Sequence, residues 1–225
     1  MKTILFQGDS ITDCGRLRQN NSGRFQRIIE KLLKRTALGD GYPALVAEEL
    51  SKCSDDLNFI NKGVSGDRVP DVYARIVRDI LYIKPDYISI LVGVNDVWHG
   101  FDFNNGTGAE RYEKVYNMLI EEIKAELPHV KIMILEPFVL KGSATADRAG
   151  QPDRFQKFSC GVKQMAEIAK KVADKHNLEF VELQKVFDKA SETTAPTLLL
   201  SDGVHPTAKG HELIKNEWIK AFDEI

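Results

Sequence analysis

The chain has 225 residues, of which 43% are hydrophobic and 28% are charged. This composition is typical of a globular protein and excludes a disordered or fibrous one. Lysine and arginine number 31 against 33 acidic residues, which gives a net charge of −2. Without a basic surplus to hold a polyanion, we expect no nucleic-acid partner.

The N-terminus carries one lysine and a short apolar run that ends at Gln7, too short for the core of a signal peptide. No stretch approaches the roughly 18–20 apolar residues of a membrane helix. The three cysteines, Cys14, Cys53 and Cys160, are odd in number and widely spaced, which fits neither a disulfide framework nor a CxxC metal site. We therefore expect a cytoplasmic protein with no membrane association and no metal.

Five apolar runs predict β-strands. In chain order they are Thr3–Gln7, Leu57–Gly63, Asp86–Asp96, Val130–Phe138 and Leu178–Leu183. Within the third and fourth runs, Ile88–Val92 and Ile132–Leu135 are apolar at almost every position. Such continuous runs indicate strands that are buried on both faces.

Helical patterns alternate with these strands. They cover Tyr42–Lys52, Val69–Ile83, Glu110–Leu127, Arg154–His176 and a last segment from Pro206 to about Phe222. The alternation favours a parallel sheet covered by helices on both faces, with right-handed crossovers. With no internal repeat, low-complexity tract or linker, residues 1–225 are predicted to form a single domain.

Residues Arg16–Gly41 are long for a connection between the first strand and its helix. Apolar residues recur there at helical spacing while lysine and arginine fill the other face. We interpret the segment as an amphipathic helix packed on the domain; a lid, a subunit contact and a membrane-surface helix are alternatives.

Ligands of open parallel α/β sheets bind outside the carboxyl ends of the strands. Gly8, Asp9 and Ser10 follow the first predicted strand, and Gly63 lies at the end of the second. Asn95 lies at the end of the third strand, and Glu136-Pro137-Phe138 at the end of the fourth. Asp202 and His205 stand just before the last helix. Small and polar residues of types used in catalysis therefore gather at one edge of the sheet.

Asp202 and His205 have the spacing of a general base and its orienting carboxylate. A histidine base needs an acceptor on its second ring nitrogen, and three residues apart in a turn the two side chains can meet. Taken alone, the pair could also be a helix cap and a polar surface histidine.

Ser10 alone could cap a helix, but acyl transfer would also need donors for a developing oxyanion. The backbone N–H of Gly63 and the side-chain amide of Asn95 could supply them. Because a hydroxyl, two donors and an Asp–His pair follow separate strands, we interpret Ser10 as a nucleophile.

Other residues near the same edge are weaker candidates. His99 is a rival base, since Asp96 precedes it at the spacing at which Asp202 precedes His205. His99, Trp98 and Phe138 are also candidate substrate contacts, with a structural role as the alternative for each.

Four sequence blocks resemble those of the SGNH (GDSL-type) hydrolase family. They are GDS at residues 8–10, NKGVSG at 61–66, GVND at 93–96 and DGVHP at 202–206. The blocks keep the family's order over nearly the whole chain, and GDSITDCGR, GVNDVW and HPTAKGH are especially similar to intracellular bacterial acetylxylan esterases and related carbohydrate acetylesterases. The long segment Arg16–Gly41 departs from the compact family pattern and leaves the shape of the pocket mouth open.

The resemblance implies a flavodoxin-like, three-layer α/β/α fold with a five-stranded parallel sheet. It implies Ser10 as nucleophile, Asp202 and His205 completing the triad, an oxyanion hole formed by the Ser10 and Gly63 N–H groups and the Asn95 side chain, and no cofactor. It also favours His205 over His99 as the base.

We therefore expect a serine esterase that removes small acyl groups, above all acetyl, from carbohydrate hydroxyls such as those of xylo-oligosaccharides. A lipase, lysophospholipase or thioesterase acting on longer chains is the first alternative. A ligand-binding protein on a degenerate hydrolase fold is the second. The expected partner is a small acylated carbohydrate; a homo-oligomer is compatible with the sequence, which names neither the sugar nor the acyl position.

Overall fold

The computed structural model describes residues 1–17 and 36–224, which contain a five-stranded parallel sheet. The strands are β1 (Lys2–Gly8), β2 (Leu57–Asn61), β3 (Tyr87–Leu91), β4 (Lys131–Leu135) and β5 (Glu179–Val181). Their order across the sheet is β2-β1-β3-β4-β5, and every neighbouring pair is parallel. The predicted sheet is confirmed.

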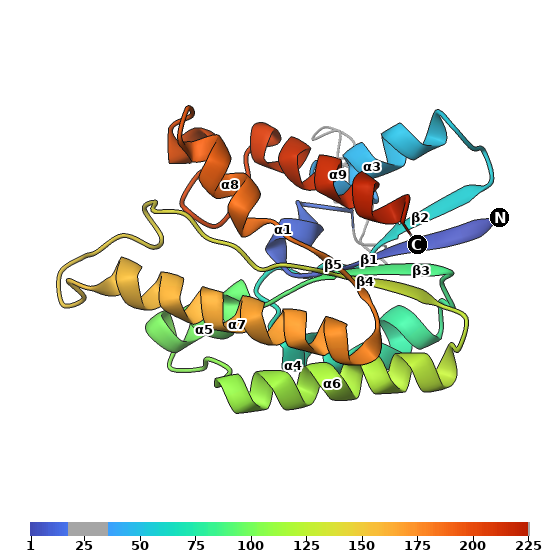
Figure 1. Cartoon of the computed structure of the whole chain (residues 1–225), viewed down its shortest axis with the longest axis horizontal. Helices are drawn as coiled ribbons and strands as arrows, with labels where there is room; N and C mark the ends of the chain where they lie inside the picture. Colours follow the sequence, from blue (N-terminus) through green and yellow to red (C-terminus); the bar gives the residue numbers. More distant parts are fainter. Residues whose placement is uncertain (18–35, 225) are drawn as a thin grey trace, which may run out of the picture.

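Helices cover both faces of this sheet (Figure 1). On one face lie α3 (Tyr42–Ser51), α8 (Gln184–Ser191) and α9 (Ala208–Phe222). On the other lie α4 (Val69–Ala74), α5 (Val94–Asp102), α6 (Ala109–Glu126) and α7 (Arg154–His176). The short α1 (Ser10–Asp13) stands at the carboxyl end of β1. The three-layer α/β/α fold expected from the sequence is thus observed.

The central strands are buried because their side chains are apolar on both faces. Ile4, Leu5 and Phe6 of β1 have no exposed surface, and Ile90 on β3 and Ile134 on β4 are equally enclosed. Burial of apolar surface on this scale drives the packing of the helix layers onto the sheet.

Several predicted boundaries need correction. The third strand ends at Leu91 rather than Asp96, because Gly93 turns the chain with φ +145° and α5 begins at Val94. The helix predicted over Val69–Ile83 is interrupted near Arg75, and a short π-helix follows at Val77–Leu81. The helix α8 was not predicted. Most of the amphipathic segment Arg16–Gly41 lies outside the described residues.

Among the helices that the structure describes, none combines the length and the apolar content needed to cross a membrane.

Gly8 fixes the point at which β1 ends against β3. A Cβ atom at this position would lie 2.3 Å from the carbonyl oxygen of Leu91 and 2.5 Å from Oγ1 of Thr12. The backbone of Leu91 cannot move away without disturbing the β1–β3 pairing, in which Gly8 is opposite Leu91. Only glycine therefore allows β1 to turn into α1 beside its neighbour.

Gly8→Ala should lower the free energy of unfolding by about 1–3 kcal/mol or more, as overpacking against a rigid backbone does. Gly108→Ala is the matched control, because nothing lies within 4 Å of a Cβ there and its φ is −66°. Chemical denaturation of both variants measures the difference. Equal stabilities would contradict the close approach of β1 and β3.

Candidate active site

Ser10, His205 and Asp202 form a chain of hydrogen bonds at the carboxyl edge of the sheet. Ser10 Oγ lies 2.9 Å from Nε2 of His205, and Nδ1 of the same ring lies 2.7 Å from Oδ2 of Asp202. All three side chains are partly buried. With its proton on Nδ1 the neutral ring can accept the serine proton, which is the arrangement of a nucleophile, its base and an orienting carboxylate.

Ser10 is the first residue of α1, which begins directly after the carboxyl end of β1. Asp9 caps the helix, its Oδ1 accepting the N–H of Ile11 at 2.9 Å. Burial raises the pKa of Asp9 to about 7. Within the part of the chain that is described, the N–H of Ser10 donates to no backbone or side-chain acceptor. It therefore remains available to an oxyanion.

Asp202 is held by its own loop as well as by the imidazole. Its Oδ1 accepts the N–H groups of Val204 at 2.9 Å and His205 at 2.8 Å. Burial alone would raise the pKa of Asp202, but the bonds from His205 and Val204 outweigh it and lower the pKa to about 2. The carboxylate stays ionised, and its bond to the ring raises the pKa of His205 above the ordinary 6.5.

Asn95 enters the site from the first turn of α5 and is buried. Its Nδ2 donates one hydrogen to the carbonyl oxygen of Asp67 at 3.1 Å. An amide nitrogen carries two hydrogens, so this bond orients the group while leaving the second N–H for a ligand.

Gly63 differs from expectation. Its N–H donates to Oδ1 of Asn61 at 2.9 Å, and a Cβ atom there would lie 2.4 Å from the backbone nitrogen of Asp13. The residue is packed against the back of α1, so its N–H is not available to a substrate. The expectation that Gly63 lines the oxyanion hole is corrected on this geometry.

Gly66, three residues later, has the properties expected of Gly63. Its φ is +87°, and no atom lies within 4 Å of where a Cβ would be. Among the described residues, no acceptor bonds its N–H. The sequence signal was present, since two glycines stand in the same block, but spacing alone does not say which of them faces open space.

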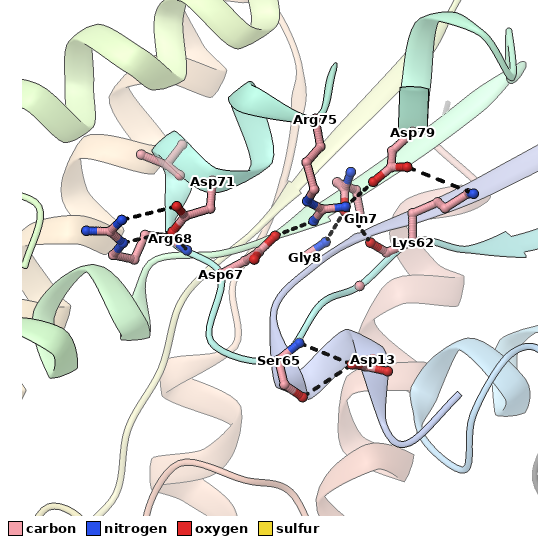
Figure 2. A network of polar contacts seen from close by, with 12 residues as sticks. Gln7, Gly8, Asp13, Lys62, Ser65, Asp67, Arg68, Asp71, Arg75 and Asp79 are labelled. Atoms are coloured by element: carbon pink, nitrogen blue, oxygen red, sulfur yellow. Dashed lines mark hydrogen bonds and ion pairs between the residues drawn. The ribbon is translucent and has the colours of Figure 1, made fainter. Parts of the chain in front are cut away.

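Three aspartates hold the loop that carries Gly66. Two of them, Asp13 and Asp67, are labelled in Figure 2. Asp13 accepts the N–H of Ser65 at 3.1 Å and its hydroxyl at 3.3 Å. Asp67 pairs with Arg75, which also pairs with Asp79.

The third carboxylate, buried Asp96, accepts the N–H of Val69 at 3.2 Å through both oxygens. The loop of residues 63–68 is thereby fixed to α1, α4 and α5. The sequence does not predict the ion pair between Arg75 and Asp67, because that pairing depends on the turn of the chain between them.

The remaining candidates, Trp98, Phe138 and His99, lie in different surroundings. The Trp98 ring lies 5.8 Å from that of His205, centroid to centroid, and is half-buried at the site. Phe138 has no exposed surface and stacks on Phe187 at 4.3 Å, so it belongs to the core and not to a substrate pocket. His99 packs against Phe103 at 5.1 Å, and Asp96 bonds to Val69 instead of to His99. Among the described residues, no hydrogen bond joins His99 to a carboxylate that could orient it as a base.

Within residues 1–17 and 36–224, no group of three or more histidine, cysteine, aspartate or glutamate side chains has an arrangement that could hold a metal ion.

Comparisons with known proteins identify the family of the chain. Residues 6–213 match the family described as GDSL-like lipase/acylhydrolase. The chain is 33% identical to an acetylxylan esterase of Geobacillus stearothermophilus, over 96% of this chain and 92% of that one. Two solved variants of that enzyme, one with a serine and one with an aspartate replaced by alanine, are described as catalytic mutants.

Solved structures are similar over almost the whole chain. The Geobacillus acetylxylan esterase superposes with a TM-score of 0.79 at 32% identity, covering 98% of this chain and 93% of that one. A protein of Parabacteroides merdae described as a GDSL-like lipase gives a TM-score of 0.83 at 34% identity, covering 99% and 95%.

Asp202→Asn should lower the pKa of the His205 ring, because a neutral amide no longer stabilises the imidazolium. In the unchanged protein the ring stays protonated to a higher pH than an ordinary histidine. NMR titration of the ring protons measures both. His211 is the internal control, since burial lowers its pKa to about 4. An unchanged His205 midpoint in the variant would show that Asp202 does not set its charge.

Proposed function

The chain belongs to the GDSL-like lipase/acylhydrolase family and is a carboxylic ester hydrolase, and we propose that it removes acetyl groups from carbohydrate hydroxyls through an acyl-enzyme on Ser10. The observation that carries this proposal is the continuous hydrogen-bonded chain from Ser10 Oγ through the His205 ring to Asp202.

Acylation begins with a proton transfer. Neutral His205 accepts the hydroxyl proton of Ser10 on Nε2, across the 2.9 Å bond, as Oγ attacks the ester carbonyl carbon. Asp202 holds the Nδ1 proton and stabilises the imidazolium that forms. The imidazolium then returns a proton to the leaving alcohol oxygen, so the sugar departs as a neutral hydroxyl.

The negative charge on the carbonyl oxygen needs donors that are fixed before the reaction. We assign these to the free N–H of Ser10, the second side-chain N–H of Asn95 and the N–H of Gly66. The hydrogen bond from Asn95 to the Asp67 carbonyl and the ion pair between Asp67 and Arg75 support this role, because they fix Asn95 and the Gly66 loop together.

Deacylation uses the same groups in reverse. His205 removes a proton from a water molecule, which attacks the acyl carbon, and the proton passes to Ser10 Oγ as the acid leaves. No group beyond the triad and the oxyanion donors is required for this step.

The preference for acetyl groups on carbohydrate rests on the similarity to an acetylxylan esterase over 96% of the chain. The position of the Trp98 ring beside His205 supports it, since a large ring there narrows the space around the acyl carbon. Hydrolysis of longer acyl esters is the second candidate, because a structurally similar protein is described as a lipase.

Ser10→Ala should reduce ester hydrolysis by roughly a thousandfold or more, since the nucleophile is lost while the oxyanion donors remain. Ser191→Ala is the matched control, as that exposed hydroxyl on α8 bonds to the carbonyl of Asp188. Steady-state kinetics with an acetyl ester measure both variants. Near-normal turnover by Ser10→Ala would remove Ser10 as nucleophile.

Rates should fall steeply from acetyl to butyryl esters and almost vanish for octanoyl esters. Each excluded methylene should cost roughly 10- to 200-fold in kcat/KM. Trp98→Ala should reduce the fall in kcat/KM with acyl length if the Trp98 ring forms a wall of the acyl pocket. Phe138→Ala should not reduce it, because Phe138 lies in the core. Octanoyl rates equal to or above acetyl rates would favour the lipase or thioesterase alternative.

A further inference from the structure

Arg154 is a buried cation at the first residue of α7. Its side chain has 0% exposure, and the residue is among the largest fully buried in the described chain. The N-terminus of a helix carries positive partial charge and favours acidic residues, so an arginine here goes against the helix dipole. A charge buried at an unfavourable position points to a role that an apolar residue cannot fill.

Every N–H group of this guanidinium has an acceptor. Nη1 and Nη2 form a fork on the two carboxylate oxygens of Asp102 at 2.9 and 3.0 Å. Nε and Nη2 both donate to the carbonyl oxygen of Ala144, at 3.0 and 2.9 Å, and Nη1 also donates to Gln151 at 2.7 Å. Phe101 and Phe158 lie 5.2 and 5.7 Å from it. These contacts leave the group one orientation.

The first connection runs from Arg154 to the base. Oδ2 of Asp102, held by the fork, accepts the indole N–H of Trp98 at 2.6 Å. That bond fixes the Trp98 ring, which packs against the His205 ring at 5.8 Å. Asp102 and Trp98 are both on α5, one helical turn apart. Arg148, about half exposed, also pairs with Asp102, so the buried Arg154 and Arg148 together hold the surface beside the imidazole.

The second connection runs from Arg154 to the carboxylate. The N–H of Ala144 donates to the backbone carbonyl of Asp202 at 2.9 Å, while the carbonyl of Ala144 accepts from Arg154. Close by, a Cβ at Gly142 would lie 2.2 Å from the carbonyl carbon of Asp202, so the two loops touch. The guanidinium thus reaches the backbone of Asp202 through a single residue.

We propose that Arg154 is a positioning residue for the Asp202–His205 pair, bracing Asp202 through Ala144 and the His205 ring through Asp102 and Trp98. The proposal rests on the proposed function in that it assigns the pair to catalysis. A fully paired arginine suits this task because its planar fork fixes both partners, whereas a lysine supplies one point of attachment. The Arg154 side chain is fully buried and does not itself contact the substrate, so its effect is on geometry.

Loss of this bracing should affect catalysis more than binding. A small displacement of the base can cost up to about a hundredfold in rate. The kcat of Arg154→Lys should fall by roughly ten- to a hundredfold with little change in KM. Besides Asp202, the titratable groups coupled to His205 are Asp9, which caps α1, and His211 on α9, and neither bonds to Arg154. Because Asp202 raises the pKa of His205, the acid limb of kcat/KM should move to lower pH.

Tryptophan fluorescence tests the geometry without a substrate. The chain contains two tryptophans, so Trp218→Phe leaves Trp98 as the only indole. An imidazolium quenches a neighbouring indole more strongly than a neutral imidazole does, so the emission of Trp98 should rise as His205 loses its proton. His205→Gln in the same background should abolish that transition. Arg154→Lys and Asp102→Asn should reduce its amplitude at least twofold and move its midpoint to lower pH.

Trp98→Phe provides a variant that leaves Arg154 and Asp102 unchanged. The acid limb of its kcat/KM should move to lower pH, a change that a role of Trp98 in the acyl pocket alone would not produce, while that of Trp218→Phe, a fully buried tryptophan in α9, stays at the parent position. This comparison remains decisive if the Arg154 and Asp102 variants do not fold.

Absence of a His205-dependent transition in the parent would overturn the proposal, as would folded Arg154 and Asp102 variants with parental fluorescence and pH profile. A fall in kcat with an unchanged pH profile and unchanged fluorescence would also overturn it, since the residue would then only stabilise the fold. If no ester is hydrolysed by any of these proteins, the proposed function fails, and the fluorescence titration still decides the bracing of His205.

Discussion

The parallel pairing of β1 with β2 on one side and β3 on the other is the constraint on which the rest of the structure depends. Because all three strands run in the same direction, the chain leaves each of them at the same edge of the sheet. Ser10, the Gly66 loop and Asn95 follow directly from these three ends. The close contact of Gly8 with Leu91 fixes the distance between the first and third of them. The site is therefore as rigid as the sheet that carries it, which is what a preorganised oxyanion hole requires.

Buried polar and charged side chains hold the loops of the site that lie outside the sheet. Asp13, Arg75 and Asp96 hold the loop of residues 63–68, and Arg154 holds the segment that contacts Asp202. The ion pairs among them, those of Arg75 and Arg154, contribute little net stability, because the cost of desolvation offsets most of the attraction. Their contribution here is geometric: each has several partners and so permits one arrangement. One group of side chains holds the loop that carries Gly66, and the other holds the segment that contacts the backbone of Asp202.

The sequence predicted the strands and most helices because burial on both faces leaves continuous apolar runs, as in Ile132–Leu135. It did not predict α5, because Gly93 to Asp96 has the composition of a turn and a helix that starts directly after a strand lacks a separate signal. In the site, Ser10 and Asn95 follow strand ends, Asp202 and His205 stand just before the last helix, and all four could be named as candidates. The sequence predicted Gly63 as a donor because spacing does not report which N–H is already bonded, and the structure leaves the N–H of Gly66 open instead. Phe138 was placed at the pocket because a strand end does not reveal which side chain turns into the core.

The central claim is that Ser10 carries the acyl group during turnover. The most direct measurement is rapid acid quenching of the enzyme during hydrolysis of an acetyl ester, followed by mass spectrometry of its peptides. The account predicts a mass increase of one acetyl group on the peptide that contains Ser10, formed within one turnover and absent from Ser10→Ala. Acetylation of a different residue during turnover, with Ser10 unmodified, would contradict it.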